Sequence, residues 1–201
     1  MKSSFLFYNN YYLLIVFFSM SIYSQTNFIV DKKGNKIIVK DNTINLSQRS
    51  ILYSIEKSMW EKNLRLDDFE YASIGKAILK PFKLTGKRKT QAYFVFAEKK
   101  DKKLIGSAIT VTSTAYKVSI SRTFYSMYVI DNDNNIIEEV GFNSHTKSNE
   151  IDDKVKLAPM VRKYFSDCPQ IIEELNKYDF PDVNGFGITG FFNNPAYIKC
   201  E

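Results

Sequence analysis

The sequence predicts an α+β fold: an antiparallel meander sheet of about five strands packed on an N-terminal helix, followed by two C-terminal helices and a short C-terminal strand pair. Apolar and polar residues alternate over successive segments between positions 76 and 142, which is the pattern of half-buried strands. Short polar links separate these segments, so neighbouring strands should run antiparallel. Apolar residues recur at helical spacing before this region and after it.

A β-hairpin is expected first. Asn27–Val30 and Lys36–Lys40 are short runs of β-favouring residues, and the turn between them contains Gly34 and Asn35. Either of these two residues can adopt the positive φ that a tight hairpin turn requires. The segment from position 27 to position 40 is therefore predicted to form two paired strands.

A helix is expected next, from about Ser47 to Asn63. Ser47 is a suitable N-cap because its hydroxyl can accept a hydrogen bond from an amide of the first turn. The predicted helix should bury Trp60 against the sheet. The apolar residues at spacings that line one helical face are Ile51, Leu52, Ile55, Met59 and Trp60.

The meander follows. Its second strand is apolar on both faces, with Tyr93 and Val95 on one side and Phe94 and Phe96 on the other, so both faces should be covered. The strands predicted, in order, are Lys76–Leu84, Thr90–Glu98, Lys103–Thr112, Val118–Ile130 and Ile136–Phe142.

Helical periodicity returns after position 149. Pro159 should interrupt or kink the first C-terminal helix. The second helix should begin near Asp167, with Pro169 in its first turn and Gln170 as a capping-box partner. The strand-like runs Phe186–Phe192 and Tyr197–Cys200 complete the chain. A curved sheet wrapped on a helix is similar to cystatin-like or NTF2-like folds, and this likeness of topology implies no activity.

The first 24 residues have the layout of a secretory signal peptide. Lys2 is the only charged residue before Asp31, an apolar run covers Tyr11–Phe18, and serines precede the expected cleavage after Ser24. The apolar run is shorter than the about 20 residues that a membrane-spanning helix needs, and an uncleaved anchor is the less favoured alternative. We therefore expect residues 25–201 to form one secreted or periplasmic α+β domain.

Cys168 and Cys200 are the only cysteines. An even cysteine count in an exported chain indicates disulfide bonding, so we expect these two residues to form a bond that ties the last residues to a helix start. The alternative is a reactive thiol at Cys168, because a helix N-terminus lowers the pKa of a thiol.

The chain is basic, with a formal net charge of +6, and lysine far outnumbers arginine. Sequence-specific nucleic-acid recognition is not expected, because base recognition relies on the planar fork of arginine. Lys87, Arg88 and Lys89 should share one end of the sheet with Lys117, where they could contact an anionic envelope component or another exported protein. Surface solubility is the alternative explanation for these lysines.

Residues suited to catalysis are sparse. The single histidine, His145, lies in a loop-like segment, and it cannot form a typical zinc site alone. Gly185–Gly190 reads GxGxxG without room for the helix and strand of a dinucleotide site, so we interpret it as a glycine-rich strand or loop. Asp131–Asn135 resembles the start of a calcium loop, but a polar hairpin turn explains it better. We expect no cofactor and no metal.

Paired carboxylates offer the strongest catalytic alternative. Asp67, Asp68 and Glu70 lie in a connection and could serve a hydrolase, which needs two carboxylates across a cleft. Solvated acids explain the same pattern. The expected function is therefore an exported, non-enzymatic binding or interaction protein of the periplasm or cell exterior. A carboxylate-dependent secreted hydrolase and a structural envelope component are the alternatives.

Cleavage after Ser24 predicts that the mature protein begins at Gln25. N-terminal sequencing of the protein recovered from its native cells tests this expectation. Thiol titration of the same unreduced sample should detect no free thiol. Recovery of a chain that begins at Met1 and carries two reactive thiols would contradict both export and the disulfide.

Overall fold

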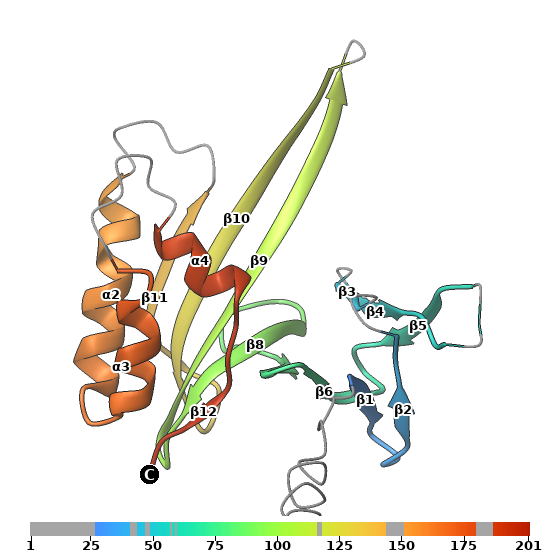
Figure 1. The fold of residues 1–201 in the computed structure, drawn as a ribbon, viewed down its shortest axis with the longest axis horizontal. Coiled ribbons are helices and arrows are strands. Elements are labelled where there is room, and N and C mark those ends of the chain that lie inside the picture. Colours follow the sequence, from blue (N-terminus) through green and yellow to red (C-terminus); the bar gives the residue numbers. More distant parts are fainter. Residues whose placement is uncertain are drawn as a thin grey trace, which may run out of the picture.

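The computed structural model describes residues 27–40, 44–46, 49–56, 58, 60–115, 118–143, 151–179 and 187–201. Within these ranges the chain forms a large curled sheet, a smaller sheet beside it, and a layer of helices on one face of the large sheet (Figure 1). The predicted leader lies outside the described residues, as do Ser47, Lys117 and His145.

The large sheet is an extended antiparallel meander. Its strands lie in the order β11-β10-β9-β8-β7-β6-β1-β2, and β12 joins β8 in parallel. The predicted five-strand sheet was too small: its strands correspond to β7–β11, and β6, β1 and β2 continue the same sheet. The bounds are β1 Phe28–Asp31, β2 Lys36–Ile38, β6 Phe69–Ile74, β7 Ala77–Phe82, β8 Gln91–Glu98, β9 Lys102–Ala115, β10 Val118–Asp131, β11 Ile136–Asn143 and β12 Ile198–Lys199.

The N-terminal helix predicted over Ser47–Asn63 was wrong. Residues 50–53 and 62–63 of this segment belong to a smaller antiparallel sheet, in which Ile51 and Tyr53 of one strand point into the same core. These side chains follow the two-residue period of a strand. Trp60, which was expected to be buried, is 79% exposed. The strands of this sheet are β3 Asn45–Leu46, β4 Ser50–Tyr53 and β5 Lys62–Arg65.

The same turn closes the β1–β2 and β10–β11 hairpins. In each turn an aspartate, Asp31 or Asp131, accepts backbone hydrogen bonds from residues two and four positions later and a third from the asparagine side chain four positions later. The positive φ falls at Gly34 and Asn134. The asparagine hydrogen bonds hold the pKa of both carboxyls below its usual value. Both turns predicted from the sequence are confirmed.

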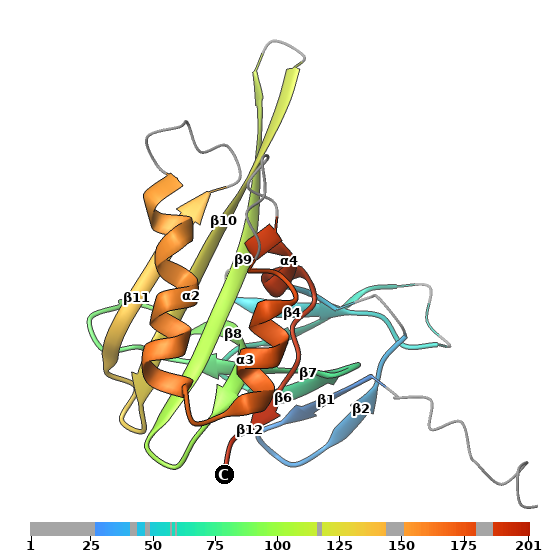
Figure 2. The same ribbon diagram turned by 60° about the vertical axis from the view of Figure 1, so that its left-hand side comes forward.

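Helices cover one face of the large sheet, as Figure 2 shows. The helix α2 continues through Pro159, so the expected interruption does not occur. The next helix begins at Pro169 with Cys168 as its N-cap and has no side-chain capping hydrogen bond. The Asp167 carboxylate pairs with Lys99. The bounds are α2 Ile151–Phe165, α3 Pro169–Asn176 and α4 Gly187–Asn193.

The segment that contains α4 was expected to be a strand or loop, and this prediction was wrong. Phe191 and Phe192 both contact the ring of Phe96, with ring centroids 4.9 and 6.0 Å apart. Neighbouring residues of a strand would point to opposite faces, whereas a helix can place both on one core. The backbone of α4 also packs closely on Tyr178, because a Cβ atom at Gly190 would lie 2.5 Å from that ring.

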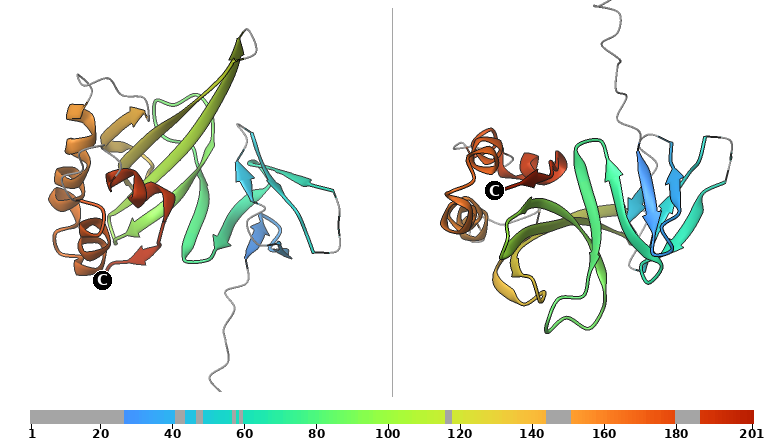
Figure 3. Two further views of the ribbon diagram at one scale, coloured as in Figure 1. Left: turned by 45° about the horizontal axis from the view of Figure 1, so that its top comes forward. Right: turned by 90° about the horizontal axis from the view of Figure 1, so that it is seen from below.

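The curl of the sheet encloses a second core on the face opposite the helices, around Tyr93 and Ile105. The loop after β7 folds against the β10–β11 hairpin (Figure 3). There the amide of Thr85 donates to the carbonyl of Asn134 at 3.1 Å, and Lys87 pairs with Glu139 at 3.2 Å. A third core joins the small sheet to β1, β6 and β7.

The predicted disulfide between Cys168 and Cys200 is confirmed, with 5.5 Å between the Cα atoms. It links the N-cap of α3 to the residue that follows β12, and the amide of Cys200 donates to the carbonyl of Glu98 at 2.9 Å. The bond therefore joins the helical layer to the end of β8.

Removal of the disulfide should destabilise the protein. A bond with a sequence separation of 32 restricts the unfolded chain, and Cys168→Ser combined with Cys200→Ser should lower the free energy of unfolding by roughly 3–4 kcal/mol. Urea denaturation measures the change. Reduction of the wild-type protein should give a similar loss and should leave the double variant unaffected. An unchanged midpoint in both experiments would show that the bond does not stabilise this fold.

Acid should weaken the contact between α2 and β11. Lys163 and Tyr164 of α2 donate to the Glu138 carboxylate at 2.7 and 2.9 Å, and these bonds, Lys163 first, hold the pKa of Glu138 below its usual value. The contact therefore stabilises the fold above the ordinary glutamate pKa of about 4.3, and this stability is lost as the pH falls through the lowered value. Stability measured against pH should flatten in Glu138→Gln, and an unchanged pH dependence in this variant would contradict the assignment.

Candidate functional site

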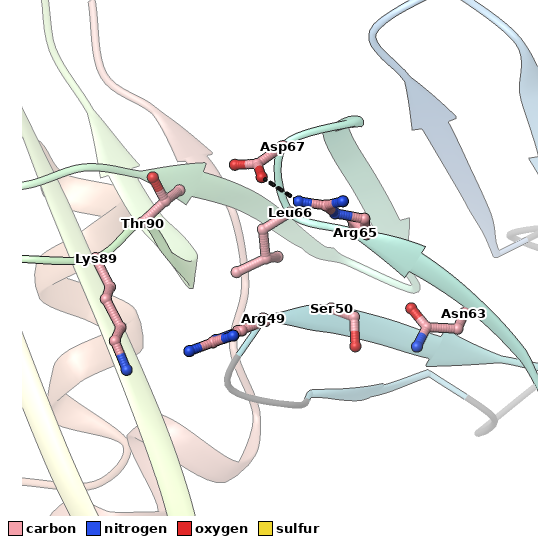
Figure 4. Close-up of a pocket in the computed structure, with 8 residues that line it drawn as sticks. All are labelled: Arg49, Ser50, Asn63, Arg65, Leu66, Asp67, Lys89 and Thr90. Atoms are coloured by element: carbon pink, nitrogen blue, oxygen red, sulfur yellow. Dashed lines mark hydrogen bonds and ion pairs between the residues drawn. The ribbon is translucent and has the colours of Figure 1, made fainter.

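A groove of about 620 Å³ opens between the small sheet and the loop that leads into β8 (Figure 4). Its walls come from the start of β4, from β5 with the turn after it, and from that loop. Polar and charged side chains dominate the lining. The residues are Arg49, Ser50, Asn63, Arg65, Leu66, Asp67, Lys89 and Thr90.

The pairing of β4 with β5 places the polar side chains of the groove. Ser50 lies opposite Arg65 in the register, and the amide of Leu66 donates to the carbonyl of Arg49 at 3.0 Å. Asn63 and Arg65 are two residues apart on β5 and are exposed, while Leu66 is buried in the core. Asn63 and Arg65 therefore lie on the same face of β5 and both line the groove, and Leu66, which follows the strand, contributes a buried apolar side chain to its wall.

The groove carries a positive charge. Arg65 pairs with Asp67 at 3.2 Å, but both side chains are more than 70% exposed, so solvent weakens this pair. Arg49 and Lys89 form no ion pair with any described residue, and Figure 4 shows both side chains reaching into the open space. Three cations against one carboxylate make the groove a favourable place for an anion.

The basic residues singled out in the sequence have separate places. Lys89 lines the groove, whereas Lys87 pairs with Glu139 and lies 5.5 Å from the centre of the Tyr128 ring. Arg88 is exposed in the same loop. Lys117 lies outside the described residues, so its predicted proximity to this loop is untested.

Of the three candidate acids, only Asp67 is among the described residues that line the groove. Its carboxylate faces Arg65. Asp68 and Glu70 are exposed, and the carbonyl of Asp68 accepts a hydrogen bond from the amide of Lys32 at 2.9 Å. The groove does not bring a second carboxylate from this set to Asp67.

Sequence reasoning missed Arg49 and Arg65. Both residues lie in or beside the segment interpreted as a helix, where their side chains carried no special meaning. The alternation of Asn63 and Arg65 with Leu64 and Leu66 was the available signal, because it has the period of a half-buried strand.

The comparisons with known proteins give no relative: no protein-family model, no curated protein and no solved structure matches this chain. Among the described residues, no helix has the length and apolar character required to cross a membrane. The same part of the chain contains no group of three or more histidine, cysteine or acidic side chains arranged to hold a metal ion.

Proposed function

We propose that this chain is an exported, non-enzymatic binding protein that holds an anionic partner in the groove formed by Arg49, Arg65 and Lys89. The observation that carries this proposal is the approach of Arg49 and Lys89 to one opening from two different elements, with no described counter-ion. Arginine can bind a carboxylate, phosphate or sulfate through two parallel hydrogen bonds, and lysine adds a compact charge.

The openness of the groove favours a segment of a large partner. Sites for small molecules enclose most of the ligand and are lined mainly by apolar side chains. Here Arg65 and Asp67 remain more than 70% exposed, and Ser50, Asn63 and Thr90 supply further polar groups. A charged stretch of a polymer can lie along such a surface without being enclosed.

Export of the protein is part of the proposal. The disulfide is of a kind that persists in oxidising compartments, which supports a place outside the cytoplasm. The arrangement of the first 24 residues, with Lys2 before an apolar run and serines after it, supports delivery by a signal peptide that is cleaved after Ser24.

Charge reversal at the groove should weaken binding of a polyanion. Poly-glutamate is the probe, and its binding to the mature protein is measured by fluorescence anisotropy at low and moderate salt. Lys89→Glu and Arg49→Glu should each raise the Kd roughly tenfold at low salt, and the difference should shrink as salt screens the charges.

Lys199→Glu is the matched control. Lys199 is exposed, and it lies beside Glu98 at the opposite end of β8 from the groove. This variant has the same change in net charge and should stay within about twofold of the wild-type Kd. Equal weakening by Lys89→Glu and Lys199→Glu would indicate a general effect of net charge and would overturn the groove as the binding site.

A further inference from the structure

The two strands β8 and β9 pair along only part of their length. Their register runs from Glu98 and Lys103 to Phe94 and Gly106. The pairing of β9 with β10 continues well beyond that point, to Ala115 and Val118. We call residues 109–115 and 118–124 the arm, which projects past the rest of the sheet in Figures 1 and 2.

A cleft of about 430 Å³ lies where β8 and β9 separate. Successive residues of β9, from Ile109 to Thr112, all contribute to its lining. Successive side chains of a strand point to opposite faces, so a cleft lined by four in a row lies along the edge of the strand. The edge carries the backbone N–H and C=O groups that β8 would otherwise pair. Leu46, Gln91, Ala92 and Ser107 complete the described lining.

This cleft adjoins the basic groove. Thr90 lines the groove, and the next residue, Gln91, lines the cleft. Arg122 brings a further cation to the arm, directly opposite Val111 in the β9–β10 register. An extended ligand that lies along β9 can therefore reach apolar and cationic side chains together.

The two faces of the arm differ in polarity. On one face Ile109, Val111, Ile120 and Phe124 are each 45–51% exposed. The other face carries hydroxyl groups that bond across the strands, Thr110 with Thr123 at 2.9 Å and Thr112 with Ser121 at 2.8 Å. Of the apolar face, Ile109 and Val111 line the cleft, where a partner can cover them.

The edge of β9 lacks the usual protection against pairing with another chain. Natural proteins place charged residues, prolines or bulges along open strand edges. From Ser107 to Ala115, β9 contains no charged residue and no proline. Within the described chain, the β8–β9 register has already ended at Gly106 when this stretch begins.

We propose that the open edge of β9 from Ser107 to Ser113 accepts an extended peptide as an added strand, and that the peptide alternates acidic and apolar residues. Its backbone pairs with β9, and its apolar side chains lie beside Ile109 and Val111 on one face of the arm. Its carboxylates then point to the other face, beside Thr110 and Thr112, with the basic groove at the adjoining end of the cleft. This mode of binding rests on the proposed function and names the class of the anionic partner.

Charge and backbone chemistry favour a peptide over two other occupants. A second copy of the mature chain would bring the same excess of positive charge and the same cations to the cleft, which opposes self-association. The hydrocarbon of a lipid surface offers no hydrogen-bond partner to the N–H and C=O groups of an open strand edge, and unpaired backbone groups are unfavourable in hydrocarbon. An acidic strand satisfies both the charge and the backbone.

The experiment measures the binding of a labelled heptapeptide that alternates glutamate and valine to the mature, oxidised protein by fluorescence anisotropy. Two further peptides carry N-methyl groups on alternate residues. In the first peptide the methylated amides point to one edge of the strand, and in the second they point to the other edge. Amides of a strand point alternately to its two edges, so only one of these peptides loses its bonds to β9. That peptide should bind at least tenfold more weakly, and the other should stay within about threefold of the parent.

Two variants of the arm test the position of the peptide. Val111→Asp, at the cleft, should raise the Kd of the peptide roughly tenfold because it replaces an apolar contact with a charge that faces the bound valines. Ile120→Asp is the matched control, since Ile120 lies on the same face of the arm, on the other strand, with a similar exposed fraction. It should change the Kd by less than about threefold. Circular dichroism and thermal melting verify that both variants fold.

The remaining outcomes overturn the proposal in distinguishable ways. Equal binding of all three peptides would reject strand addition and leave the proposed function standing. The same conclusion would follow if the protein bound poly-glutamate but did not bind the heptapeptide. If the protein bound anionic phosphatidylglycerol vesicles but not the peptide, and both arm variants abolished this binding, the arm would be assigned to a lipid surface. A dimer in sedimentation that Val111→Asp dissociates would assign the edge to a second copy. Failure of both the peptide and poly-glutamate to bind would reject both proposals.

Discussion

The helical layer and the enclosed second core both depend on the hydrogen-bonded pairing of β9 with β10. Each strand has 14 residues, and the register between them runs without a shift from Lys102 and Asp131 to Ala115 and Val118. Next to the β9–β8 pairing, this hairpin packs on the helices through one face, which carries Leu104 and Met127, and on the enclosed second core through the other face, which carries Ile105 and Tyr128. The part of the hairpin beyond this packing is the arm. One continuous ladder thus serves as the centre of the fold and as the proposed binding edge.

The path of β8 connects the stability of the fold to its candidate sites. Several contacts fix one end of β8. β12 pairs beside it, the amide of Cys200 donates a hydrogen bond to the carbonyl of Glu98, and the Tyr197 hydroxyl donates to the Glu98 carboxylate at 3.0 Å. Burial, together with that hydrogen bond, raises the pKa of Tyr197 to about 12, so this donor stays protonated. The other end of β8 turns away from β9 and carries Lys89 and Thr90 to the small sheet. The cleft and the groove both arise from this divergence.

Local sequence patterns correctly predicted those features of the fold that residues close together in the sequence determine. The Asp31 and Asp131 turns, the strands β7–β11 and the disulfide follow from residue types within short segments, or from the presence of only two cysteines. The fold as a whole was not predicted, because Ile51, Leu52 and Ile55 satisfy a helical spacing and also suit strands. Packing of Ile51 and Tyr53 on the large sheet decides between these states, and that contact is distant in sequence.

Long-range contacts also explain why the candidate site was only partly predicted. Lys89 was selected for its charge, but its approach to Arg49 depends on how the small sheet lies against the loop before β8. The contact of Thr85 with Asn134 likewise depends on the curl of the sheet, which brings together two loops that are far apart in the sequence. The open edge of β9 could not be recognised from its own residues, because it exists only where β8 departs.

The close contact between Gly190 and Tyr178 has a consequence for the evolution of this chain. A methyl group at position 190 would overlap the aromatic ring, so α4 can lie this close to Tyr178, which follows α3, only while position 190 is a glycine. Selection should therefore act on the two positions as a pair. In homologous sequences a larger residue at position 190 should occur only together with a smaller side chain at position 178, and this covariation would be visible without any measurement on the protein itself.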